Sequence, residues 1–169
     1  VNRVFLFLAL MVSLWAIGIA NEILSPNAEV ATLWLRIFHI GVCFIPVAFY
    51  HFAVAVIDGV ERNKHFIFLG YVIALLFICF IPSPLFIQGV QQIIQFPYYL
   101  KPGPLYHGFM LFFVGYPALA EYQLILSARE LKGNKSKQAQ YVFIAGLVGF
   151  IGGLTSYLPA FSLKIYPFM

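Results

Sequence analysis

The chain contains, at residues 30–57, the run VATLWLRIFHIGVCFIPVAFYHFAVAVI, in which Arg36 is the one acidic or basic side chain apart from two histidines. A helix needs about 20 mostly apolar residues to cross the hydrocarbon core of a bilayer. This run exceeds that length, so it predicts a membrane-spanning helix that is tilted or is kinked at Pro46.

The rest of the chain has the same character. Of its 169 residues, 62% are hydrophobic and 9% are charged, and the mean hydropathy is +0.91. A soluble domain carries about 25% charged residues, which this chain lacks. We therefore expect an all-α fold, a polytopic transmembrane helix bundle that forms a single domain over residues 1–169. The five expected spans are residues 4–24, 30–57, 66–81, 105–127 and 138–158.

Two connections between these spans carry turn signals. The first is SPNAE, where Ser25 is the expected N-cap and Pro26 the expected first residue of the next helix. The second is the longer segment 82–104, which contains LFIQGVQQIIQFPYYLKPG. This composition fits either an amphipathic helix in the membrane interface or a hairpin that turns at Pro102–Gly103.

The basic residues indicate the sidedness of the bundle. Lysine and arginine gather in cytoplasmic loops, and here seven lie at one set of span ends against two at the other. The first set is Arg3, Arg62, Lys64, Arg129, Lys132, Lys135 and Lys137, and the second is Lys101 and Lys164. Loops 58–65 and 129–137 are therefore expected to be cytoplasmic, and loop 82–104 to face outward. Five tyrosines then fall at the outer interface as an aromatic belt, namely Tyr98, Tyr99, Tyr106, Tyr157 and Tyr166.

No sequence motif indicates catalysis. The chain has no phosphate-binding loop, no nucleophile elbow and no zinc-protease motif. Cys43 and Cys79 lie inside apolar runs and form no paired spacing. We expect no catalytic residue, no metal site and no cofactor. The basic residues border apolar runs, which favours the lipid bilayer as a partner over nucleic acid.

Polar residues inside the spans are the strongest functional signal, because each costs about 2.5–3.5 kcal/mol at mid-helix unless it is paired. Asn21 and Glu22 end the first span, and Arg36 and His39 lie on one face of the second at a similar depth. A Glu22–Arg36 ion pair is the expected contact. The four residues form either a structural clamp of the helical hairpin or the polar floor of an outward-facing pocket for an unidentified small ligand. His39 fits a hydrogen-bonded core histidine better than a ligand.

Two further features lie deeper in the bundle. His51 and Glu121 are expected near the inner interface, where they either reach the headgroups or couple two helices. Gly146, Gly149 and Gly153 belong to GLVGFIGG, and small residues at this spacing let helices approach closely in lipid. This stripe fits packing within the bundle better than a dimerisation face.

Three segments together resemble a known family. They are NEILSPNAEVATLWLRIFHIGVCFIPVAFYHFAVAVIDG, YYLKPGPLYHGFMLFFVGY and KQAQYVFIAGLVGFIGGLTSYLPAFSLKIYP. The chain is similar to the seven-transmembrane N-terminal sensor region of bacterial histidine kinases. The resemblance implies that the five spans are the second to sixth helices of a seven-helix bundle, with the seventh beginning at Ile165. It also implies the bacterial inner membrane as the location.

The resulting hypothesis is a membrane-embedded sensor domain that detects an extracytoplasmic or membrane signal and passes it inward by helix repacking around Pro46 and GLVGFIGG. The chain contains neither a phosphoacceptor helix nor an ATP-binding domain, so we expect no enzyme activity from it alone. Expected partners are the bilayer and a second copy or a larger membrane complex. The alternative is an accessory structural subunit of a larger membrane protein complex, either with or without bound pigment or haem.

Overall fold

Five long helices form the molecule in a computed structural model, which describes residues 1–93 and 96–161. They are α1 (Asn2–Ile23), α2 (Ala28–Val56), α3 (Val60–Phe80), α4 (Leu105–Glu130) and α5 (Asn134–Thr155). A short 3₁₀ helix, η1 (Pro159–Phe161), follows α5. Each of the five helices is long and apolar enough to cross a membrane. The predicted five-span helical bundle is thus confirmed over the described residues.

The helices extend beyond the apolar runs that predicted them. Helix α3 begins at Val60 rather than near residue 66, and α4 continues to Glu130. Hydropathy marks only the part of a helix that is apolar, whereas backbone hydrogen bonding continues through the charged residues at its end. Helix α2 runs through Pro46 as one helix.

The turn between α1 and α2 differs from its prediction. Asn27 is the N-cap of α2, because its side-chain oxygen accepts a hydrogen bond from the Val30 amide at 3.0 Å. The Ser25 hydroxyl instead donates to the Asn21 carbonyl at the end of α1. The prediction of Ser25 as N-cap was wrong because its side chain completes the preceding helix.

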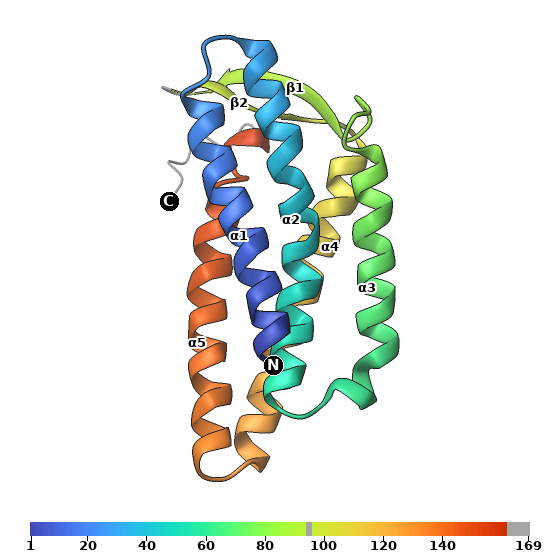
Figure 1. The fold of residues 1–169 in the computed structure, drawn as a ribbon, viewed down its shortest axis with the longest axis vertical. Coiled ribbons are helices and arrows are strands. Elements are labelled where there is room, and N and C mark those ends of the chain that lie inside the picture. Colours follow the sequence, from blue (N-terminus) through green and yellow to red (C-terminus); the bar gives the residue numbers. More distant parts are fainter. Residues whose placement is uncertain (94–95, 162–169) are drawn as a thin grey trace.

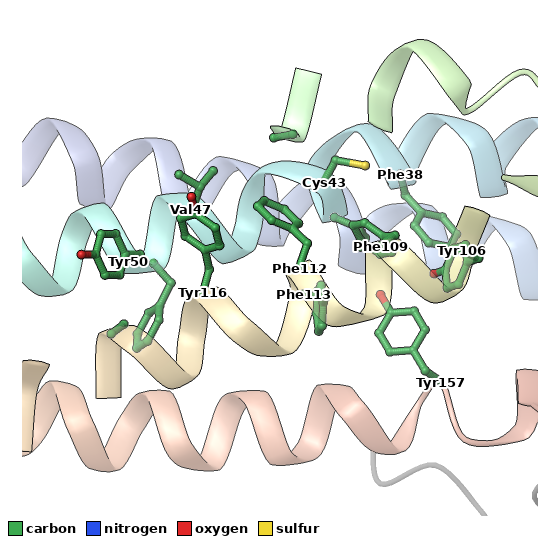
Figure 2. Close-up of a cluster of buried hydrophobic side chains, with 14 of the residues drawn as sticks. Phe38, Cys43, Val47, Tyr50, Tyr106, Phe109, Phe112, Phe113, Tyr116 and Tyr157 are labelled. Carbon is green, nitrogen blue, oxygen red and sulfur yellow. The ribbon is translucent and has the colours of Figure 1, made fainter. Parts of the chain in front are cut away.

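Helix α2 is the centre of the bundle and packs against each of the other four helices (Figure 1). Its partner along the core is α4, and aromatic rings fill the space between them (Figure 2). Tyr157 extends from the end of α5 toward the same cluster. In its most apolar window, 72% of α2 is buried, which fits a helix that is apolar around most of its circumference.

The segment between α3 and α4 is a β-hairpin, one of the two predicted alternatives. Strands β1 (Ile87–Ile93) and β2 (Phe96–Pro102) pair antiparallel, with Val90 opposite Leu100. The predicted turn at Pro102–Gly103 was wrong, because these residues lie at the junction of β2 and α4. Gly103 is required there: a side chain would meet the backbone of Leu85, and the Gly103 amide bonds to the Phe86 carbonyl at 2.9 Å.

The connections gather at two ends of the bundle (Figure 1). At one, here called the hairpin end, lie the hairpin, the α1–α2 turn and η1. At the other, here called the loop end, lie the N-terminus, the α2–α3 turn and the α4–α5 loop. Lys135 of α5 forms an ion pair with Asp58 of the α2–α3 turn, which joins two segments of the loop end. For the described residues, the predicted sets of span ends therefore coincide with the two ends of the molecule. Lys164 and the expected start of a seventh span at Ile165 lie outside the described residues.

Two tyrosines of the predicted aromatic belt are buried. Tyr106 and Tyr157 are at the hairpin end but are buried in the bundle core, with 0% and 7% of their surface exposed. They cannot face headgroups, so this part of the prediction was wrong. Tyr166 lies outside the described residues.

Candidate functional site

A small cavity lies under the hairpin, where α1, α2, β2 and the end of α5 meet. Its volume is about 40 Å³. One water molecule needs roughly 10–15 Å³ of such space, so the cavity has room for a few waters or a similarly small polar group. Helix α1 provides Trp15 and Glu22, α2 provides Phe38 and His39, and β2 covers the space from above.

Two side chains leave unpaired polar atoms at this cavity. Glu22 is only 6% exposed, and its Oε1 atom is buried with no hydrogen-bond partner among the described residues. Ser156, 9% exposed, lies across the cavity, and its hydroxyl is likewise buried and unpaired within the described chain. Burying a polar group without a partner costs about 1–3 kcal/mol. Because both residues line the same small space, this space is the candidate site for a polar guest.

His39 forms the rigid side of the cavity. Its Nδ1 donates to the Leu35 carbonyl at 2.7 Å, because a carbonyl oxygen only accepts hydrogen bonds. In the neutral imidazole, Nε2 is then the acceptor and receives the Tyr106 hydroxyl at 2.9 Å. Both ring nitrogens are engaged by the protein, so His39 is a hydrogen-bonded core histidine that contributes its ring, rather than a free nitrogen, to the cavity wall.

Tyr99 links the hairpin to the bundle. Its hydroxyl donates to the backbone carbonyl of Ser156, just beyond α5. Burial, followed by the nearby Glu22 carboxyl, raises the pKa of Tyr99 to about 12. The hydroxyl therefore stays protonated at neutral pH and remains able to donate this bond. Through Tyr99, the strand that covers the cavity is tied to the helix on its far side.

The structure brings together only part of the predicted polar cluster. Glu22 and His39 line the cavity, whereas Asn21 and Arg36 do not. The Asn21 amide donates to the Ile17 carbonyl within α1 at 2.8 Å. The predicted Glu22–Arg36 ion pair is absent from the described residues: their two ion pairs are Lys64–Glu61 and Lys135–Asp58. The buried Nε of Arg36 also has no hydrogen-bond partner within the described segments.

Sequence reasoning missed the residues that close the cavity. Ser156 and Tyr99 carry no local motif, and their contact joins positions 57 residues apart. The available signal was the LTSYLP segment, where a serine and a tyrosine end an apolar run beside a proline. That signal does not reveal which strand would meet it.

The other predicted residues lie elsewhere in the bundle and apart from each other. His51 Nδ1 is 3.2 Å from the Tyr71 hydroxyl of α3. Glu121 of α4 lies beside Gly146 of α5, and both its carboxyl oxygens are buried and unpaired among the described residues. Because His51 faces α3 and Glu121 faces α5, the structure does not join them.

The glycine stripe of α5 is divided. A side chain at Gly146 would meet the ring of Phe49, so this glycine permits close packing inside the bundle. No atom lies within 4 Å of a side chain placed at Gly149, and Gly153 faces only Trp15, at 3.9 Å. Only the first of the three predicted glycines therefore packs within the described bundle.

Comparison with protein families adds an independent finding. The family model described as the N-terminal 7TM region of histidine kinase matches residues 1–169. Comparisons with curated proteins and with solved structures give no match. The family model covers the whole chain and agrees with the resemblance that three sequence segments carry. The chain therefore belongs to the family of N-terminal seven-transmembrane regions of histidine kinases.

Proposed function

We propose that the chain is a multi-pass membrane sensor domain of the histidine-kinase type, a function that its family membership and its five membrane-length helices support. We propose that the cavity under the hairpin is its input site, that the hairpin end faces outward from the bacterial cell membrane, and that the hairpin moves when the cavity gains or loses a small polar guest. The observation that carries the proposal is the pair of unpaired buried atoms, Glu22 Oε1 and Ser156 Oγ, at one covered cavity.

The sign of the charges supports this orientation. The loop end carries Arg62, Lys64 and the basic residues of the α4–α5 loop, which is the pattern of cytoplasmic loops. The loop end is then the side on which a kinase module lies, and a signal received under the hairpin has to cross the bilayer.

A guest alters the output only to the extent that it binds two conformations with different affinity. In the proposed mechanism, a guest that bonds to Glu22 and Ser156 competes with the local contacts of the strand above them. The end of α5 then shifts relative to α1 and α2. Close packing at Gly146 and the missing backbone hydrogen bond at Pro46 are the places where such a shift is transmitted along the helices.

Two tyrosines of β2 give a matched test. Tyr99→Phe removes the hydroxyl that bonds to the Ser156 carbonyl, while Tyr98→Phe removes one that has no hydrogen bond in the described part of the chain. A hydrogen bond contributes about 0.5–1.5 kcal/mol, which is roughly a two- to tenfold change in a two-state equilibrium. We expect Tyr99→Phe to shift basal autophosphorylation of the full-length protein in membrane vesicles by that factor, and Tyr98→Phe to leave it unchanged.

Glu22→Gln is the second variant, because it keeps the shape of the side chain and removes its ability to carry charge. It should also shift basal autophosphorylation. If Tyr99→Phe and Glu22→Gln both behave like Tyr98→Phe, the cavity is not the input site.

The accessory-subunit alternative finds no supporting observation. A histidine that ligates haem needs one imidazole nitrogen free to coordinate, and both nitrogens of the most deeply buried histidine, His39, are bonded to protein groups. An absorption spectrum of the purified protein distinguishes the two functions, since a bound pigment supports the accessory role.

A further inference from the structure

A second and much larger hollow separates α1 from α5. Its volume is about 500 Å³. Helices α1 and α5 form its walls, and side chains of α2 and α4, among them Val42 and Phe113, form its floor. The lining is aliphatic and aromatic, and the polar side-chain groups of its residues are two tyrosine hydroxyls and the indole N–H of Trp15. The two walls barely touch one another, although they stand side by side (Figure 1). We call this hollow the α1–α5 groove.

The walls of the groove are the least covered helices of the bundle. We compare the share of the most apolar 18-residue window that is buried in each helix. This share is 6% in α1 and 17% in the segment from α5 to η1, whereas it is 72% in α2. Exposure by itself is normal in a bilayer, because lipid chains are as apolar as leucine. A hollow between two such helices differs from simple exposure. Its two walls and its floor give three surfaces that one further helix can contact at the same time.

The α5 wall is shaped for a close neighbour. Gly149 has no atom within 4 Å of where its side chain would start, and Gly153 has only Trp15, at 3.9 Å. In lipid, small residues at four-residue spacing let two helix backbones approach closely, which increases the van der Waals contact that drives helix association. This part of the glycine stripe is thus unused inside the described bundle.

The course of the chain identifies the neighbour. The family region has seven spans, and the described residues hold five. The chain leaves α5 through η1, which packs against β2 at the hairpin end, and Tyr157, just before η1, lines the groove. A span joined to η1 by a short connection would begin beside Tyr157 and would run antiparallel to α5. Short connections place consecutive helices side by side.

We infer that the membrane span that follows Phe161 in the full-length protein packs in the α1–α5 groove. We call this position the seat of the span. This seat gives Trp15 and Tyr157 a specific position, because both side chains line the groove and also the cavity under the hairpin. They are the shared wall between the cavity and the span that leads away from the sensor. The seat itself follows from the groove and the chain path, so it stands whether or not the cavity is the input site.

Disulfide cross-linking in the full-length protein tests the seat. Cys43→Ala and Cys79→Ser remove the native thiols, Gly149→Cys places one thiol on the α5 wall, and a second cysteine is moved one residue at a time along the following span. Mild oxidation in membranes should give a cross-link within one chain, at positions three or four residues apart. Val12→Cys, on the α1 wall, should link to the opposite face of the same span.

Phe68→Cys is the matched control, because Phe68 is 72% exposed and lies on α3, away from the groove. It should link to no position of the following span. Cross-links from Gly149→Cys only between two chains would assign the groove to a second copy and overturn the inference. Links to a span preceding α1, or reaction only with a lipid-borne maleimide, would overturn it equally. Autophosphorylation is not part of this readout, so its outcome is independent of the proposed function.

Discussion

At the scale of the residue, the close contact between α1 and α2 depends on two glycines outside the GLVGFIGG stripe. Gly18 of α1 lies directly against Phe38 of α2, and a side chain at Gly41 of α2 would come within 2.7 Å of the Met11 carbonyl. These two glycines let α1 and α2 approach until their backbones nearly touch. In a bilayer, where burial of apolar surface contributes little, such close packing is a main source of association.

A change at Gly18 tests this contact. Gly18→Ala places a methyl group against Phe38, and overpacking of this kind destabilises a protein by roughly 1–3 kcal/mol. Gly115→Ala is the control, because nothing lies within 4 Å of that position on α4. Gly115→Ala should leave the free energy of unfolding unchanged or raise it by up to about 1 kcal/mol, because alanine has the higher helix propensity. Unfolding of the detergent-solubilised protein in sodium dodecyl sulfate measures both. Equal stability of the two variants would contradict the contact.

The hydrogen bond between Tyr106 and His39 is a second contact that depends on a single hydroxyl group. Tyr106→Phe removes the hydroxyl and leaves His39 Nε2 buried without a donor, which costs about 1–3 kcal/mol. Tyr122→Phe on the same helix removes a hydroxyl from a side chain that is 58% exposed. We expect the first variant to lower the free energy of unfolding by that amount and the second to change it little. If Tyr106→Phe left the free energy of unfolding unchanged, water or another group would have to replace the hydrogen bond to His39.

At the scale of the element, the turns of the loop end are held by backbone geometry more than by charge. Asp58, between α2 and α3, has a positive φ of 54°, a left-handed conformation that aspartate and asparagine tolerate and β-branched residues do not. Its ion pair with Lys135 is largely exposed, with 69% and 50% of the two side chains accessible. Exposed ion pairs contribute roughly 0–1 kcal/mol, and less at high salt.

Two substitutions at Asp58 separate these effects. Asp58→Asn keeps the turn conformation and removes the charge, so it should change the free energy of unfolding by less than about 1 kcal/mol. Asp58→Val forces a β-branched residue into the left-handed region and should cost about 1–3 kcal/mol. Salt titration of unfolding provides the check on charge. A larger loss from Asp58→Asn than from Asp58→Val would mean that the ion pair, and not the backbone, holds the turn.

At the scale of the whole molecule, segregation of the connections fixes which ends of the five helices lie together. Lys101 is on β2 at the hairpin end, and Lys135 is at the start of α5 at the loop end. With the proposed orientation, these two lysines lie on opposite sides of the membrane.

Cysteine labelling of intact cells tests the orientation. In a background without the native thiols, Lys101→Cys should react with a membrane-impermeant maleimide added outside, and Lys135→Cys should react only after the membrane is opened. The same protein in inverted vesicles should give the reverse pattern. Outside labelling of Lys135→Cys would invert the proposed orientation while leaving the fold unchanged.

The number of spans, the position of the loops and the family were determined by the sequence. Apolar runs of about 20 residues have one stable form in a bilayer, a helix with all its backbone groups bonded internally, so hydropathy alone locates α1 to α5. Lysine and arginine gather in the loops on one side of a membrane, and their seven-to-two distribution also indicated which span ends lie together.

Only the tertiary structure decided which polar groups meet. Glu22 and His39 were readable as buried polar residues, but their neighbours Tyr99 and Ser156 come from segments far along the chain, and the expected partner Arg36 lies outside the cavity. The choice between hairpin and helix for residues 82–104, and the division of the α5 glycines between the core and an open groove, depend in the same way on packing. Hydropathy is a property of each segment alone, whereas a contact between side chains depends on the relative position and rotation of two packed segments.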